Sequence, residues 1–214
     1  MSDNVKKRKK LILIGGGGHC KSVLDAAIQM KNFEEIVIVD NSIPIGMDIM
    51  GCRVVGNDDV LPELYAKGFL NAFITVGSIK SADRRVNIYK KVRKSGFVFP
   101  NIIDPSAIVS RYADLGNGVF IGKHAVVNSG ALIDDMSIIN TGAIIEHESR
   151  VGKFTHISVG AVVCGNCEIG DYAFIGANAT IIQGVKIGMS SVVGAGNVIL
   201  RNISENTTIV HGGG

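Results

Sequence analysis

The sequence of 214 residues contains no tryptophan, and aromatic residues make up only 6% of it. Charged residues are also scarce, at 19%, and the formal net charge at pH 7 is +3. So weak a charge excludes a surface built to coat nucleic acid, although small acidic ligands remain plausible. The basic run at residues 6–10 carries much of this charge, and we interpret it as a polar flank before a first strand.

Long apolar runs are missing as well. The sequence nowhere contains about 18 consecutive apolar residues, so no transmembrane helix is expected. The apolar stretch at residues 11–14 then meets glycine, and it is too short to be the core of a secretory signal peptide. We therefore expect a cytoplasmic protein. With 46% hydrophobic residues, the chain is nonetheless too apolar to stay disordered.

Only four cysteines are present, which fits a reducing compartment. Cys164 and Cys167 have the spacing of half a zinc site or of a redox pair, but the sequence has no second such pair. Cys20 and Cys52 each stand alone. We therefore expect no metal site, and the repeat described next gives Cys167 a structural explanation.

The second half of the chain has an aliphatic residue at every sixth position. A mostly small residue follows four places later, and Cys167 is one of these small residues. Glycine, asparagine or aspartate often comes directly after the aliphatic residue, and we interpret these as turn residues. The aliphatic residues are Ile103, Val109, Leu115, Ile121, Val127, Ile133, Ile139, Ile145, Val151, Ile157, Val163, Ile169, Ile175, Ile181, Ile187, Val193 and Ile199.

A period of six fits neither an α-helical face nor a strand that alternates between two faces. It predicts a solenoid in which each hexapeptide forms one side and three hexapeptides form a triangular coil of about 18 residues. The aliphatic residues would then stack from coil to coil.

The first hundred residues alternate between strand and helix patterns. We predict strands at residues 11–14, 36–39 and 72–76, and helices at residues 21–31 and 82–95. This alternation indicates a small parallel sheet, beyond whose carboxyl ends ligands bind. The glycine run at residues 15–18 lacks the third glycine of the dinucleotide fingerprint, so a nicotinamide enzyme is not favoured. Its amides at a helix N-terminus would suit a phosphate, although a tight turn alone would also explain the glycines.

Polar residues interrupt the repeat at one place. Asn140 is followed by Glu146, His147 and Glu148, and then by His156. A histidine flanked by two carboxylates can be oriented as a general base.

The repeat resembles the hexapeptide-repeat superfamily of left-handed parallel β-helices, whose best-known members are acyltransferases. Nearly the whole chain resembles the bacterial sugar acetyltransferases, because the glycine turn, Asp40, Gly77 and the pattern Asn-x6-His-Glu-x7-His occur in the same order. The UDP-4-amino-sugar N-acetyltransferases are the most similar, with related perosamine N-acetyltransferases and sialic acid O-acetyltransferases. The resemblance implies a Rossmann-like α/β N-terminal domain over residues 1–100 that binds a nucleotide sugar. An all-β left-handed parallel β-helix over residues 101–214 would carry the acetyltransferase site.

The resemblance also implies a role for each residue of the β-helix site. His147 would be the general base, and Glu148 would orient it. His156 would lie by the thioester of acetyl-CoA, and the backbone N–H of Gly165 would stabilise the carbonyl oxygen as it gains negative charge. Two residues one coil apart, Ala177 and Ala195, would contact the pantetheine arm of acetyl-CoA.

A nucleotide-linked amino sugar would be the acetyl acceptor in this family. Asn41 stands where the members acting on a UDP-4-amino sugar have a second acid, so the sugar or its charge can differ here. The chain also lacks the Gly-x-Pro-Ala segment common near the end of family members, which indicates either a truncated chain or an altered CoA site. The residues implied to bind the acceptor are Gly17, Gly18, His19, Asp40, Asn41, Gly77 and Asn140.

Family members are homotrimers with each site in a groove between neighbouring β-helices, so His147 and His156 can act from different chains. We favour N-acetylation, with sialic acid O-acetylation as the alternative and a non-catalytic trimeric scaffold as a further one. A β-helical zinc enzyme would need three converging imidazoles. His124, His147 and His156 occupy different positions of the hexapeptide, which argues against that reading.

Overall fold

The structure is a computed structural model, and it describes residues 9–77 and 81–210. The chain divides into two compact units, one formed by residues 1–76 and 88–100 and the other by residues 77–87 and 101–214. Residues 77–87 therefore group with the repeats rather than with the first hundred residues. No helix in the described ranges is long and apolar enough to cross a membrane.

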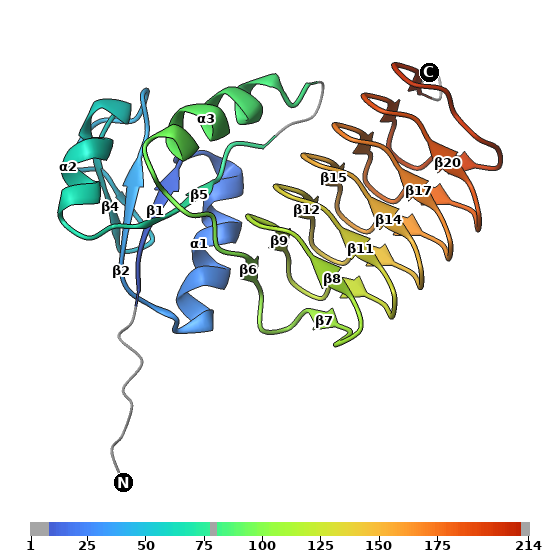
Figure 1. The fold of residues 1–214 in the computed structure, drawn as a ribbon, viewed down its shortest axis with the longest axis horizontal. Coiled ribbons are helices and arrows are strands. Elements are labelled where there is room, and N and C mark those ends of the chain that lie inside the picture. The colour runs from blue at the N-terminus through green and yellow to red at the C-terminus, as the bar shows by residue number, and fades with distance from the viewer. Residues whose placement is uncertain (1–8, 78–80, 211–214) are drawn as a thin grey trace, which may run out of the picture. The chain divides into compact units, whose positions relative to one another are not determined.

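The first unit is built on one five-stranded sheet in the order β3-β4-β2-β1-β5 (Figure 1). All its pairings are parallel except β3 with β4. The central strand β1 buries Leu11, Ile12 and Leu13 completely, as parallel strands usually do. The elements are β1 (Lys9–Ile14), α1 (Gly18–Met30), β2 (Phe33–Val39), β3 (Asp48–Ile49), β4 (Cys52–Gly56), the 3-10 helix η1 (Asp58–Val60), α2 (Leu61–Ala66), β5 (Asn71–Ile74) and α3 (Asp83–Lys94), whose residues 83–87 group with the second unit.

Each strand and helix predicted for the first hundred residues is present, with its ends shifted by no more than three residues. The short elements β3, β4, η1 and α2 were not predicted, because residues 48–66 carry no sustained period of either kind. The predicted α/β domain is confirmed.

The second unit is a parallel β-helix whose three sheets have seven, six and five strands (Figure 1). Neighbouring strands pair residues one coil apart, as Ile138 pairs with Phe120 and His156. The seven-stranded sheet contains β6 (Ile102–Ile103), β9 (Phe120–Ile121), β12 (Ile138–Ile139), β15 (His156–Ile157), β18 (Phe174–Ile175), β21 (Val192–Val193) and β23 (Thr208–Ile209). The six-stranded sheet contains β7 (Ile108–Val109), β10 (Val126–Val127), β13 (Ile144–Ile145), β16 (Val162–Val163), β19 (Thr180–Ile181) and β22 (Val198–Ile199). The five-stranded sheet contains β8 (Asp114–Leu115), β11 (Leu132–Ile133), β14 (Arg150–Val151), β17 (Glu168–Ile169) and β20 (Lys186–Ile187).

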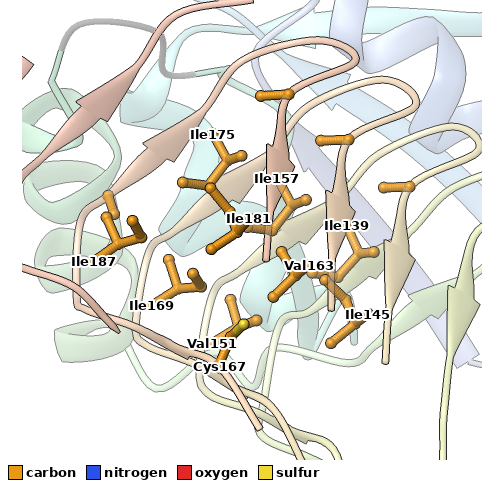
Figure 2. Close-up of a cluster of buried hydrophobic side chains, with 14 of the residues drawn as sticks. Ile139, Ile145, Val151, Ile157, Val163, Cys167, Ile169, Ile175, Ile181 and Ile187 are labelled. Carbon is orange, nitrogen blue, oxygen red and sulfur yellow. The ribbon is translucent and has the colours of Figure 1, made fainter. Parts of the chain in front are cut away.

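The aliphatic residue of each hexapeptide is the second residue of a strand and points into the solenoid. Ile139, Ile157 and Ile175 stack from coil to coil in one sheet, and Cys167 lies in the same core beside Val151 (Figure 2). Cys167 is fully buried, as expected for a small inward-facing position. The predicted parallel β-helix is confirmed.

The corners of the β-helix depend on a different residue from the one predicted. In the hexapeptides from Leu115 to Val193, the residue three places after the aliphatic position has a positive φ, for example +53° at His124 and +59° at Glu148. The glycines directly after the aliphatic residue are not needed for turn conformation, and that interpretation was wrong. A Cβ on Gly176 would lie 2.5 Å from the backbone N of Ala195, so these glycines allow the coils to stack closely.

The outer faces of the three sheets differ in chemistry. The five-stranded sheet presents charged groups, including an ion pair of 2.8 Å between Lys186 and Glu168. The six-stranded sheet presents only β-branched side chains, and those at its two ends, Ile108 and Val198, are well exposed. The outward residues of the six-stranded sheet are Ile108, Val126, Ile144, Val162, Thr180 and Val198.

Candidate active site

His156 begins β15 on the outer side of the seven-stranded sheet, and it is only 8% exposed. Asn140, which follows β12 one coil below, places its Nδ2 atom 3.2 Å from Nε2 of His156. Phe174, directly above in β18, meets the imidazole edge to face, with ring centroids 5.3 Å apart. The imidazole is therefore held between two neighbouring coils.

A groove of about 650 Å³ runs over the upper coils beside this sheet. It begins at Phe174, the neighbour of His156, and reaches Val210 in the last coil. The remaining lining is mostly small or apolar, which suits a long, thin ligand. Its lining residues are Ser158, Phe174, Gly176, Ala177, Val192, Gly194, Ala195, Thr208 and Val210.

Ala177 and Ala195, predicted from the sequence, both lie in this groove. Among residues 81–210, no acceptor is recorded for the backbone N–H of either alanine. At the equivalent place in a lower coil, the side chain of Asn140 accepts the N–H of Thr141 at 2.8 Å. Glycine precedes both alanines and has no such side chain, so two donors face the groove one coil apart.

His147 lies in the turn between β13 and β14, and it is exposed. Its imidazole packs on Gly165, one coil further along, because a Cβ on that glycine would lie only 2.5 Å from Nε2 of His147. A glycine is therefore required at position 165 to seat the ring.

The backbone N–H of Gly165 has no acceptor among the described residues of the β-helix. One coil below, the N–H of His147 donates to Oε2 of Glu146 at 3.2 Å. Cys164 occupies the place of Glu146 in the next coil and provides no carboxylate there. Among the described residues of the β-helix, the N–H of Gly165 therefore lacks the carboxylate acceptor that the N–H of His147 has.

The carboxylate of Glu146 contacts the backbone of His147. Its Oε2 atom accepts hydrogen bonds from Nδ2 of Asn128, at 2.9 Å, and from the N–H of His147. Glu148, which the sequence argument favoured, has a left-handed backbone and packs its Cγ over Gly130. Asn128 gave a signal in the sequence, because it lies 18 residues before Glu146 and therefore one coil below it. Its contact with Glu146 was not predicted.

One chain does not bring His147 and His156 to the same side of the β-helix. His156 lies on the seven-stranded sheet, whereas His147 lies at the corner between the six-stranded and five-stranded sheets. Asn140 lies at hydrogen-bond distance from His156, and the ring of His147 packs on Gly165. The two histidines therefore belong to two separate parts of one chain.

The first unit holds most of the residues predicted to bind the acceptor. Gly17 is the N-cap of α1, and no side chain caps this helix. A Cβ on Gly17 or Gly18 would meet no atom of residues 9–77 or 81–210 within 4 Å, whereas one on Gly16 would lie 2.5 Å from Ile43. The turn itself therefore needs Gly16, whereas no described residue fills the space beside Gly17 and Gly18.

Asp40 organises the loop beside these glycines. Its carboxylate accepts backbone hydrogen bonds from Gly16 and Ser42, each at 2.7 Å, and from Ile43 at 3.0 Å. Asn41 accepts the N–H of Asp58 at 3.0 Å. His19 lies in the first turn of α1, half-buried. Gly77 and Asn140 belong to the second unit instead.

Cys20 and Cys167 are structural by their surroundings. Burial raises the pKa of Cys20 to about 11 and also raises the pKa of Cys167. The thiol of Cys167 donates to the carbonyl of Ile182 at 3.1 Å. A neutral, buried thiol is a poor nucleophile and a poor metal ligand. The described residues contain no group of three His, Cys, Asp or Glu that could hold a metal ion.

Two protein-family models match the chain. The PglD N-terminal domain matches residues 10–92, and the bacterial transferase hexapeptide repeat matches residues 148–183 and 166–201. A search of curated proteins found no match.

Solved structures match almost the whole chain. A histidine variant of perosamine N-acetyltransferase from Caulobacter crescentus, in complex with CoA and GDP-perosamine, is 33% identical, with a TM-score of 0.87 over 93% of this chain and 92% of that one. The acetyltransferase domain of PglB from Neisseria gonorrhoeae, in complex with acetyl coenzyme A, is 33% identical, with a TM-score of 0.88 over 94% and 95%. WeeI from Acinetobacter baumannii is 19% identical and shares the fold, with a TM-score of 0.77 over 95% and 97%.

The α/β unit, the β-helix and these two relatives at 33% identity agree with the resemblance seen in the sequence. The chain belongs to the PglD-type family of hexapeptide-repeat sugar N-acetyltransferases.

Proposed function

We propose that this protein transfers the acetyl group of acetyl-CoA to the amino group of a nucleotide-linked amino sugar. The observation that carries the proposal is the groove above His156, along which lie Ala177 and Ala195, whose backbone N–H groups have no recorded acceptor among residues 81–210. The two relatives at 33% identity were solved with CoA or acetyl coenzyme A, and one of them also with GDP-perosamine.

Acetyl-CoA fits the groove by its chemistry. The pantetheine arm is long, thin and amide-rich, so its carbonyl groups are suitable acceptors for the two N–H donors. With its thioester at the end near His156, its adenine end would lie toward Thr208 and Val210 in the last coils. His156 is then the side chain closest to the reacting carbonyl.

His147 supplies the base in this proposal. The amine of the sugar attacks the thioester carbonyl carbon, and His147 takes the proton that the amine must lose. The carbonyl oxygen becomes negative and accepts hydrogen bonds from His156 and from the N–H of Gly165. The carbon–sulfur bond then breaks, and the CoA thiolate receives a proton from His147. A well-placed base contributes about 10²- to 10⁴-fold to such a reaction.

A site of this kind needs a second copy of the chain. His147 with Gly165 and the groove with His156 lie on different sides of one β-helix, so a neighbouring copy would bring the missing half. The uncovered β-branched face of the six-stranded sheet favours such an assembly, because exposed apolar faces of this kind usually pack against another subunit. We propose a homotrimer in which each site takes His147 from one chain and His156 from the next.

The nucleotide would bind at the start of α1. The open space beside Gly17 and Gly18 gives a phosphate access to an uncapped helix N-terminus. His19 and the loop held by Asp40 and Asn41 would contact the rest of the nucleotide. In the second unit, Gly77 and Asn140 are the other residues proposed to bind the acceptor.

The test is release of free CoA from acetyl-CoA in the presence of UDP- or GDP-linked 4-amino sugars, or of sialic acid. We expect turnover with one of the amino sugars and its loss, by at least about 100-fold, in a His147→Ala variant. His124→Ala is the matched control, since His124 is an exposed histidine at another corner of the β-helix. Turnover with sialic acid alone would replace N-acetylation by O-acetylation. Absence of acetyl-CoA binding would contradict the proposal.

A further inference from the structure

The amide of Asn140 has a defined orientation. Its Oδ1 atom accepts the backbone N–H of Thr141 at 2.8 Å. A backbone N–H can only donate, so the oxygen of the amide must be the atom on that side. The Nδ2 group, which can only donate, is then the atom that faces His156.

This orientation determines what the facing atom of His156 must be. Nδ2 of Asn140 lies 3.2 Å from Nε2 of His156, which is a hydrogen-bond distance. Two N–H groups cannot share a hydrogen bond, so Nε2 must offer its lone pair. A neutral imidazole carries one proton, and that proton must then be on Nδ1.

The surroundings keep the ring in this arrangement. His156 is nearly buried, and Phe174 packs edge to face against it from the coil above. A ring with protons on both nitrogens would place an N–H against the N–H of Asn140. The contact with Asn140 therefore favours the neutral ring as well as one tautomer.

We propose that Asn140 is a positioning residue that holds His156 as the neutral tautomer protonated on Nδ1. The part of this inference that concerns catalysis rests on the proposed function. The single N–H that His156 can donate to the thioester oxygen is then on Nδ1. His156 then donates a hydrogen bond to the thioester oxygen, while His147 accepts the proton of the attacking amine. By fixing the tautomer of His156, Asn140 keeps it as the donor. This places Asn140 with the acetyl donor, in addition to the sugar contact implied by the resemblance.

The direct test is nitrogen NMR of the histidine rings in protein labelled with ¹⁵N-histidine and free of substrates. A His156→Gln variant identifies the signals of His156 by their loss. At a pH well above the ordinary histidine pKa of about 6.5, we expect a pyrrole-type signal for Nδ1 and a pyridine-type signal for Nε2. In Asn140→Asp the carboxylate keeps the bond to Thr141 but now accepts from Nε2. We expect the proton to move to Nε2, which leaves no N–H on Nδ1.

The same variant separates positioning from a structural role. Asn140→Asp should lower kcat by about 100-fold, the usual cost of losing one oxyanion donor, and change KM for acetyl-CoA by less than about threefold. Asn202→Asp is the matched control. Its side-chain oxygen also accepts a backbone N–H, from Lys186 at 2.9 Å, and no hydrogen bond to a described histidine is recorded for it.

The outcomes distinguish this inference from the proposed function. A wild-type His156 protonated on Nε2, or a tautomer unchanged in Asn140→Asp, overturns the positioning role. A tautomer shift in a wild-type protein that transfers no acetyl group keeps the role of Asn140 and rejects the proposed function. A tautomer shift together with an unchanged kcat in Asn140→Asp overturns the catalytic part of the inference.

Discussion

The imidazole of His147 rests on the Cα atom of Gly165, one coil further along the β-helix. The residue proposed as base therefore packs against the residue whose backbone N–H is proposed to stabilise the oxyanion. Any side chain at position 165 must move one of them.

Gly165→Ala should therefore reduce activity without unfolding the protein. The added Cβ would approach within 2.5 Å of Nε2 of His147, and the exposed ring can rotate away. We expect kcat to fall by about 100-fold, as for other displaced catalytic groups. Binding of acetyl-CoA and the melting temperature should stay close to wild type. Wild-type kcat in this variant would show that the packing of His147 on Gly165 does not contribute to the reaction.

Side chains that fill the groove should raise KM for acetyl-CoA and leave KM for the amino sugar nearly unchanged. Ala177→Leu and Ala195→Leu place three additional carbon atoms in a groove that both alanines line. We expect KM for acetyl-CoA to rise by at least about tenfold in each variant, and KM for the amino sugar to change little. Gln183→Leu is the control, because Gln183 holds the equivalent turn position at a different corner and is exposed. Equal effects on both substrates would argue against this location for acetyl-CoA.

Cys20 should make stability depend on pH in the alkaline range. Burial raises its pKa from 9.0 to about 11, so the native state holds the thiol proton that the unfolded state loses. The native state is thus favoured below pH 9, and this contribution is lost as the pH rises through 11. The loss amounts to roughly 2 kcal/mol of unfolding free energy.

Urea unfolding at pH 8 and pH 11 would measure this loss, and Cys20→Ala should lack it. Cys164→Ala serves as the control, since Cys164 is only half-buried. A wild-type protein and a Cys20→Ala variant with the same pH dependence would refute the assignment.

The sequence predicted the β-helix well because its period of six is independent of distant contacts. Each hexapeptide from Ile103 to Ile199 carries an aliphatic residue that must point inward, and small residues such as Cys167 fill the remaining inward positions. The same register also placed Ala177 and Ala195 in one groove. The reason for the glycines between coils was missed, because the close approach of Gly176 to Ala195 appears only once the coils are stacked.

The contacts that orient the site could not be read from the sequence. Asn140 was expected to bind the sugar, yet it faces His156 across a full coil. Arg85 gave no signal in the sequence, but it is 1% exposed and its guanidinium donates to the carbonyls of Met136 and Phe154. Its pKa is lowered to about 10 by burial. Such contacts between residues distant in sequence depend on how helix α3 and the coils meet within the second unit.

The central claim is that His147 and His156 form one active site although they lie on different sides of one chain. Two inactive variants, His147→Ala and His156→Ala, would be co-expressed and purified as mixed assemblies. If neighbouring chains share each site, random trimers should recover about a quarter of the wild-type activity, because one interface in four has both histidines. Mixed assemblies as inactive as either parent would contradict the claim.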